Sequence, residues 1–147
     1  MSQDIQAVLK EYSFWKRQVI VLQGDIEELQ RGIKQVAGPA TSHIDASGIN
    51  GGATIQQSQE EFLTLHKEQM QLELQKKEVH LMRLEHNINN VERAINVLPK
   101  TDKEIINRRY IDGMTWENTA LWVQASIGFC RKHASKALEH LAHVYFL

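Results

Sequence analysis

Several residue types are scarce in this chain of 147 residues, and each scarcity excludes a class of protein. A single cysteine permits no disulfide within the chain, so a reducing cytoplasm is the compartment expected. No run approaches the roughly 20 apolar residues of a membrane-spanning helix, and the first residues, Met1-Ser2-Gln3-Asp4, lack the pattern of a secretory signal. The two prolines, Pro39 and Pro99, each fall where other signals mark an element boundary. The sequence therefore predicts a cytoplasmic protein with no membrane partner.

Neither sign of charge is in large excess overall, but charge is unevenly placed along the chain. The formal net charge is −1, yet from Pro99 onward seven Lys or Arg stand against five Asp or Glu, a net charge of +2. The first 98 residues carry ten basic and thirteen acidic residues, a net charge of −3. A basic surplus in one segment is typical of a part that binds nucleic acid. The last third of the chain is therefore where we expect a site.

The first segment, residues 4–37, repeats apolar residues at alternating steps of three and four. This spacing predicts one long helix with a continuous apolar seam of about five heptads. The helix has to end by Gly38-Pro39, because proline cannot continue it. The seam positions are Ile5, Val8, Tyr12, Trp15, Val19, Leu22, Ile26, Leu29, Ile33 and Val36.

A segment rich in Gly, Ser, Thr and Asn follows at residues 38–57 and predicts a flexible loop, with a partner-binding loop as the alternative. Ser58 and Glu61 then form a capping box, so we expect a second helix from about residue 59 to residue 97. Lys77 interrupts its apolar seam, which consists of Met70, Leu74, Leu81, Leu84, Ile88, Val91, Ile95 and Leu98.

Two long helices joined by a flexible loop are expected to fold back as an antiparallel, coiled-coil-like hairpin over residues 1–97. A unit of only two helices leaves much apolar surface uncovered. Either a homodimer through the hairpin or packing of the following domain would cover that surface.

The last segment, residues 98–147, begins with a short helix expected over residues 101–112. Thr101 followed by Glu104 is a capping box that can satisfy two unpaired backbone amides at the start of this helix. Gly113 is expected to end the helix, since glycine is the usual residue just beyond a helix terminus.

Two further helices follow and complete a helix-turn-helix. Thr115 can cap a helix of about eight residues, Gln124 and Ala125 can form the turn, and Ser126 can cap a third helix over residues 127–141. A small residue at Ala120 suits the close crossing of the two helices. The apolar stripe of the third helix is Cys130, Ala134, Ala137, Leu138 and Leu141. The fold class predicted for the whole chain is therefore all-α: a long helical hairpin, then a three-helix domain over residues 98–147.

The face of helix 127–141 opposite this stripe carries the candidate DNA-binding residues. Arg131 can bond guanine bidentately, whereas Lys132 contributes mainly a point charge toward phosphate. Ile127 lies at the exposed start of the helix. Phosphate contacts are also expected from Lys136, Thr115 and Arg109. The full set of candidates is Arg131, Lys132, Ser135, Gly128, Ile127, Thr115, Lys136 and Arg109.

Other chemistry finds little support in the sequence. Cys130 and His133, like His140 and His143, lie along one straight helix and cannot converge on one metal ion. Cys130 also falls on the apolar stripe, which is no place for a nucleophile. We therefore expect no catalytic residues, no metal and no cofactor, and a protein that is not an enzyme.

The stretch from Leu98 to Leu141 resembles region four, the promoter-reading domain, of bacterial sigma factors. The resemblance rests on Arg109-Tyr110-Ile111-Asp112-Gly113-Met114-Thr115-Trp116-Glu117, with Ala120, Ser126, Lys136-Ala137-Leu138 and Leu141 following. His133 stands where that family usually has an apolar residue. Similar segments behind a long helical part occur in phage late-gene regulators of the ArpU and RinA type. The resemblance implies a sigma-like transcription activator in a bacterial host cytoplasm, with double-stranded DNA and host RNA polymerase as partners.

Three functions remain open at this point. The first is a sequence-specific DNA-binding transcription regulator that reads the major groove with helix 127–141. The alternative is a DNA-packaging recognition subunit of the phage small terminase type, which would form a ring. A purely structural helical adaptor is the third. Oligomeric state separates the first two, because a monomer or dimer favours transcription and a closed ring favours packaging.

Overall fold

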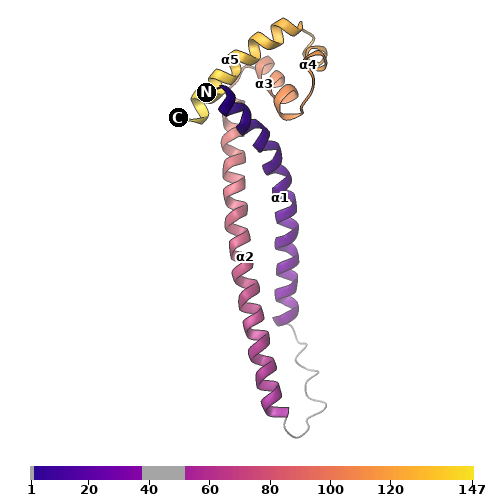
Figure 1. Cartoon of the computed structure of the whole chain (residues 1–147), viewed down its shortest axis with the longest axis vertical. Coiled ribbons are helices and arrows are strands. Elements are labelled where there is room, and N and C mark those ends of the chain that lie inside the picture. The colour runs from indigo at the N-terminus through magenta and orange to yellow at the C-terminus, as the bar shows by residue number, and fades with distance from the viewer. Residues whose placement is uncertain (1, 38–51) are drawn as a thin grey trace. The chain divides into compact units, whose positions relative to one another are not determined.

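The computed structural model describes residues 2–37 and 52–147, and throughout these two ranges the chain is helical or in short connections, without a strand. The elements follow one another as α1 (Ser2–Ala37), α2 (Gly52–Asn96), α3 (Lys100–Ile106), the π-helical turn η2 (Asn107–Ile111), α4 (Trp116–Val123) and α5 (Ile127–Tyr145) (Figure 1). The predicted all-α class is confirmed. None of the described helices has an apolar stretch long enough to cross a membrane.

The chain divides into two compact units, which differ from the two domains expected on either side of residue 98. Unit 1 comprises Met1–Val19 with Arg83–Leu147, and unit 2 comprises Ile20–Met82. The start of α1 and the end of α2 thus belong with the three short helices. The physical reason is a shared core, because Ile5 and Leu9 of α1 lie in one buried cluster with Leu138 and Leu141 of α5.

Unit 2 is an antiparallel pair formed by the second part of α1 and the first part of α2 (Figure 1). Leu22 and Ile26 of α1 are buried. Gly32 allows a close approach, since a Cβ atom there would lie 2.5 Å from the end of the Met70 side chain. Lys77, which interrupts the seam, is only partly exposed, and its Nζ lies 3.7 Å from an Asp25 carboxylate oxygen.

The start of α2 was expected too late in the chain. The prediction placed a loop over residues 38–57 and a capping box at Ser58, but α2 begins at Gly52 and Ser58 lies inside the helix. Residues 53–57 include Ala53 and two glutamines, which are good helix formers, and extending a helix costs far less than nucleating one. Residues 38–51 of the expected loop lie outside the described residues.

Unit 1 has two buried clusters, and α5 contributes to both. The larger one joins the start of α1, the end of α2, α3 and the second half of α5. Its buried members are Ile5, Leu9, Tyr12, Val91, Ala94, Ile95, Leu98, Ile106, Ala137, Leu138, Leu141 and Ala142. The smaller one joins α3, α4 and the first half of α5 through Ile105, Ala120, Cys130 and Ala134. The predicted stripe of α5 is confirmed, and Ala120 is buried where α4 packs against α5, as predicted.

The first short helix is interrupted in a way that the sequence did not predict. It begins at Lys100 after Pro99, with no side-chain cap, so the capping box expected at Thr101 is wrong. The Pro99 carbonyl instead accepts from the Lys103 amide at 2.9 Å. After Ile106 the chain widens into the π-helical turn η2, in which the Asp112 amide donates to the Asn107 carbonyl at 2.8 Å.

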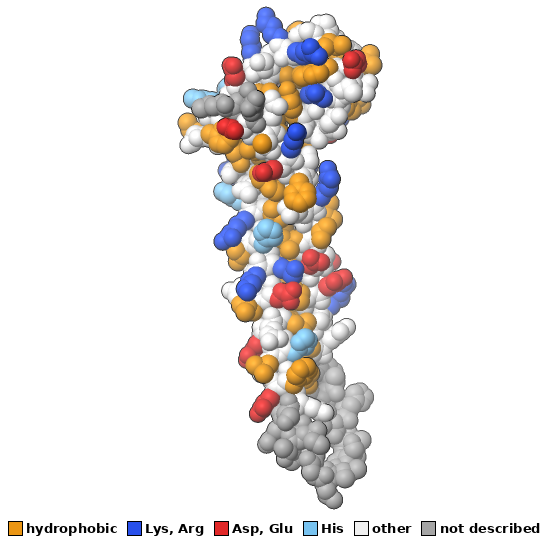
Figure 2. All heavy atoms as spheres, in the orientation of Figure 1, with side chains coloured by type: hydrophobic (Ala, Val, Ile, Leu, Met, Phe, Trp, Pro, Cys, Tyr) orange, Lys and Arg blue, Asp and Glu red, His pale blue; other side chains and the backbone are white. Residues whose placement is uncertain are grey.

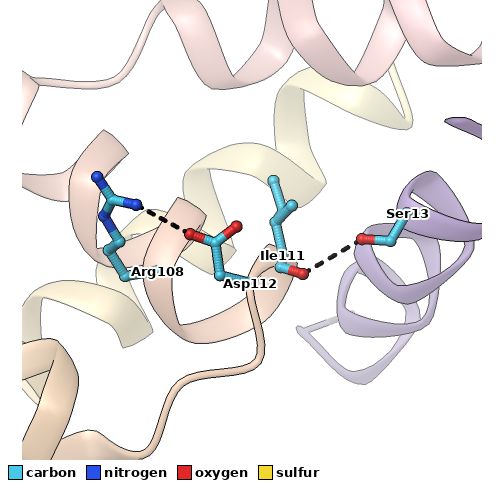
Figure 3. A network of polar contacts seen from close by, with 4 residues as sticks. All are labelled: Ser13, Arg108, Ile111 and Asp112. Carbon is cyan, nitrogen blue, oxygen red and sulfur yellow. Dashed lines mark hydrogen bonds and ion pairs between the residues drawn. The ribbon is translucent and has the colours of Figure 1, made fainter.

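Gly113 ends this helix as predicted, with a φ of +74° that favours glycine. Two polar contacts hold the turn just before it (Figure 3). The Ser13 hydroxyl of α1 donates to the Ile111 carbonyl at 3.3 Å, and the Arg108 guanidinium pairs with Asp112 at 3.1 Å. π-helical turns are frequent at functional sites, and η2 presents two adjacent arginines, Arg108 and Arg109.

Candidate nucleic-acid interface

Two capped helices joined by a short turn form the candidate site. The Thr115 hydroxyl accepts from the Asn118 amide at 3.2 Å at the start of α4, and the Ser126 hydroxyl accepts from the Phe129 amide at 3.1 Å at the start of α5. Between the helices, Gln124 adopts the left-handed conformation with a φ of 59°. Both predicted caps and the predicted turn are confirmed.

The first half of α5 has two distinct faces. Cys130 and Ala134 are buried against α3 and α4. The opposite face lies in solvent, and its exposed members are Ile127, Gly128, Arg131, Lys132, Ser135 and Lys136. Figure 2 shows blue basic side chains beside orange apolar ones on the visible face of unit 1. All six of the candidate DNA-binding residues on α5 are thus accessible to a ligand.

The second half of α5 is committed to the core of unit 1. Leu138, Leu141 and Ala142 are buried against the start of α1 and the end of α2. Beyond Lys136 the exposed side of α5 carries Glu139 and His140 rather than Lys or Arg, so the basic part of the predicted reading helix 127–141 is its first half. The N-terminal end of α5, where backbone amides and exposed side chains coincide, is the part best placed to enter a groove.

Trp116 brings two arginines together. The guanidinium of Arg109 lies 4.9 Å from the centre of the Trp116 ring, and that of Arg131 lies 5.7 Å from it. Tyr110 packs edge-on against the same ring, with the ring centres 6.3 Å apart. Both arginines are within the distance at which a cation is attracted to an aromatic ring, so Trp116 restricts where Arg131 can reach.

Arg109, which the sequence offered as a phosphate contact, is engaged within unit 1. One of its terminal nitrogens donates to the Met114 carbonyl at 2.8 Å, and its Nε is buried without a hydrogen-bond partner among the described residues. The side chain therefore holds the turn between η2 and α4 together. Thr115, another expected phosphate contact, is exposed and uses its hydroxyl as the cap of α4.

Arg108 and Trp122 form a second basic and aromatic pair that the sequence did not reveal. The Arg108 guanidinium lies 4.1 Å from the centre of the Trp122 ring and pairs with Asp112 (Figure 3). Trp122 is 55% exposed rather than part of the core. Sequence reasoning missed this pair because Arg108 and Trp122 lie on different elements, η2 and α4.

His133 and Asp102 connect α5 to α3. The His133 Nδ1 lies 2.8 Å from an Asp102 carboxylate oxygen, and the ring centre of Phe129 lies 4.0 Å from that of His133. The sequence signal was His133 itself, at a position where sigma-like domains usually have an apolar residue. The contact holds α5 against α3 at the residue that follows the candidate Lys132.

Cys130 is fully buried, and burial raises the pKa of its thiol above the ordinary value. A raised pKa leaves less of the nucleophilic thiolate at neutral pH, which agrees with a core role for this side chain. Within residues 2–37 and 52–147, no three His, Cys, Asp or Glu side chains are grouped so that they could hold a metal ion.

Comparison with known proteins places the chain in a family. A search of curated proteins finds no match. A search of solved structures finds none either. One family model, described as "Protein of unknown function (DUF722)", matches residues 22–143, which include α3, α4 and most of α5. Because this match covers most of the sequence, the chain belongs to the DUF722 family, whose function is unknown.

Proposed function

We propose that this protein binds a specific sequence in double-stranded DNA by placing the first half of α5 in the major groove. The observation that carries the proposal is the exposed face at the start of α5, the second of two capped helices joined by a short turn, with Gly128, Arg131 and Lys132 next to one another. A second helix presented in this way is how helix-turn-helix proteins contact base edges.

The exposed residues suit different parts of a duplex. Arg131 can direct its planar guanidinium at the O6 and N7 atoms of guanine, which is worth about 1–3 kcal/mol of base discrimination. Lys132 and Lys136 suit phosphate oxygens, and Ile127 suits an apolar contact with a thymine methyl group. Gly128 has no side chain, and the space that a Cβ atom would take there is empty within 4 Å. DNA can therefore approach the backbone of α5 closely at this point.

Arg109 then has an indirect part. The guanidinium groups of Arg109 and Arg131 both lie over the Trp116 ring, and both carry positive charge. Since Arg109 is anchored on the Met114 carbonyl, we infer that it and Trp116 position Arg131 rather than contact phosphate. The positive charge of the pair also favours the approach of a polyanion.

The proposed biological role is regulation of transcription. The resemblance of residues 98–141 to region four of sigma factors supports it, as does the likeness in layout to phage late-gene regulators of the ArpU and RinA type. On this proposal the protein acts in the cytoplasm of a bacterial host, with host RNA polymerase as a further partner. The net charge of +2 from Pro99 onward is modest, so a second DNA contact is expected to add affinity.

The proposal is tested with two substitutions on a DNA sequence selected from a random duplex library. We expect Arg131→Ala to abolish the preference for the selected sequence, measured by fluorescence anisotropy against scrambled DNA. Lys132→Ala should weaken binding to both duplexes and lower the slope of log affinity against log salt by about one. Exposed basic residues of α1, changed in Arg17→Ala and Lys10→Ala, serve as matched controls.

Two outcomes would reject parts of this proposal. If Arg131→Ala and Lys132→Ala both bind DNA as the parent does, α5 is not the DNA-binding helix. Mapping of bound sites in the genome separates the roles. Sites upstream of an operon support regulation of transcription, whereas sites at a DNA-packaging start, together with a closed ring in solution, would favour the packaging alternative.

A further inference from the structure

Unit 2 carries a second line of apolar side chains besides the one that α1 covers. Five large apolar residues of α2 are between 44 and 68% exposed. We name this set the outer stripe, and its members are Phe62, Leu65, Leu72, Val79 and Met82. Surface apolar residues are common singly, but a line of them along one helix marks a contact surface.

Leu65, Leu72 and Val79, the centre of the outer stripe, face away from α1, and Phe62 and Met82 lie about 80° to either side of them. With about 100° of rotation per residue, Leu65, Leu72 and Val79 fall on one side of α2, because seven residues make nearly two full turns. Leu74, a partly buried seam residue, is rotated by about 200° from Leu72 and so lies on the opposite side. The pair of helices in unit 2 thus has an apolar seam inside and an apolar stripe on the back of α2.

The order of the outer stripe is symmetric about its central residue. Phe62 and Met82 stand ten residues from Leu72, and Leu65 and Val79 stand seven residues from it. A two-fold axis through Leu72 would therefore bring Leu65 of each copy to the height of Val79 of the other copy. We propose that α2 pairs through this stripe with the same helix of a second copy, in antiparallel orientation, with Leu72 at the axis.

Charge favours the antiparallel orientation over the parallel one. Glu68 and Lys76 are exposed and lie four residues before and after Leu72. In the antiparallel pair each Glu68 is at the height of Lys76 of the second copy, so opposite charges approach each other. In a parallel pair Glu68 would lie beside Glu68 and Lys76 beside Lys76, and such like-charge pairs are destabilising.

The area involved fits a weak dimer. Burying one large aliphatic side chain contributes about 1.5–3 kcal/mol at about 25 cal/mol per Å², which corresponds to roughly 60–120 Å² for each residue. The three central residues give roughly 180–360 Å² per copy, and Phe62 and Met82 add to this at the edges, so the area is well below the about 800 Å² of a standard specific interface. Area alone does not set affinity, and an interface below the standard size is expected to give a dimer that dissociates on dilution. This pairing does not depend on DNA binding.

The association is tested on the full chain without DNA by sedimentation equilibrium over a range of protein concentrations. We expect Leu72→Glu to raise the dissociation constant of the dimer at least tenfold. Gln71→Glu, an exposed neighbour outside the stripe, is the matched control and should leave it unchanged. Circular dichroism checks that each variant keeps its helix content. A parent chain that stays monomeric at about 100 µM, or that forms a closed ring, overturns the proposal.

Orientation is tested by cysteine crosslinking and by charge exchange. A mixture of Leu65→Cys and Val79→Cys chains should form a disulfide-linked dimer, whereas either variant alone should not; crosslinking of the single variants would show parallel pairing and overturn the proposal. The parent chain is the control for Cys130, which is fully buried. Glu68→Lys and Lys76→Glu should each weaken the dimer, and the double variant should restore it. Failure of DNA binding in the α5 variants would leave every one of these results unchanged.

Discussion

Gly128 offers a way to separate the stability of the fold from the affinity for DNA. It is the second residue of α5, on the exposed face next to Arg131 and Lys132, and a Cβ atom there would meet nothing within 4 Å. Gly128→Ala therefore adds a methyl group without any clash in the free protein. On the proposed function, the same methyl group enters the space that DNA has to occupy.

The two effects of Gly128→Ala have opposite signs. Glycine in a helix is less favourable than alanine by about 0.5–1 kcal/mol, so the free energy of unfolding should rise by up to that amount. For a chain of this length the thermal midpoint should rise by about 1–4 °C. The affinity for the selected duplex should fall about fivefold, a loss of about 1 kcal/mol, because the methyl group moves α5 away from the base edges.

Both quantities are measured on the same variant, by thermal unfolding followed by circular dichroism and by fluorescence anisotropy with the selected duplex. Gly24→Ala is the matched control, since a Cβ atom on Gly24 of α1 also meets nothing within 4 Å. It should raise the thermal midpoint without changing the affinity. If Gly128→Ala is more stable but binds DNA as tightly as the parent, the start of α5 does not approach DNA closely, and the proposed docking is refuted.

Three further perturbations probe unit 1. Gly113→Ala should destabilise the fold by about 1–2 kcal/mol in urea unfolding, because Gly113 has a φ of +74° that other residues adopt at a cost; an unchanged midpoint would contradict this. Asp102→Ala and His133→Ala should each lower the free energy of unfolding by about 0.5–1.5 kcal/mol, because each removes the contact between these two side chains. A double-mutant cycle in which the two losses simply add would mean that the contact contributes nothing. Burial, and then the hydrogen bond to Glu92, raises the pKa of Tyr12 from 10.0 to about 12. The contribution of Tyr12 to the free energy of unfolding is therefore fully present below pH 10 and decreases as the pH rises toward 12. Tyr12→Phe should flatten this decrease in unfolding curves, and an equally steep decrease would refute the assignment.

Local features of this fold were predictable because they depend on residues close together in the sequence. The stripe of α5 follows from the spacing of apolar residues at three and four, and all of its predicted members are buried. The caps at Thr115 and Ser126 and the helix end at Gly113 follow from side-chain and backbone preferences within a few residues.

Features that depend on packing were not predictable in the same way. A π-helical turn has no reliable local signature, so residues 101–112 were expected as one regular helix. The grouping of the start of α1 with α5 depends on contacts between Ile5 and residues near the other end of the chain. Seam patterns say which side of a helix is buried, but they do not say which element covers it at each point along its length.

In the candidate site, too, local features could be predicted and features that depend on packing could not. That Arg131 and Lys132 are exposed could be predicted, because both lie opposite the apolar stripe on one helix. The attachment of Arg108 to Trp122 and of His133 to Asp102 could not, since each pair joins different elements across the fold. Arg109 shows the same limit: its positive charge suggested a phosphate contact, which stays a prediction, but its hydrogen bond to the Met114 carbonyl could not be predicted from the sequence.

The shared core of unit 1 has a consequence for synthesis on the ribosome. Ile5 precedes Leu141 by 136 positions in the chain, yet both are buried in one cluster. The apolar residues at the start of α1 can pack against the end of α2 first, but they are fully covered only after α5 has been synthesised. Closing a loop of that length is expected to be a late step in the folding of the newly made chain, and truncation before α5 would leave the start of α1 without its partners in α5.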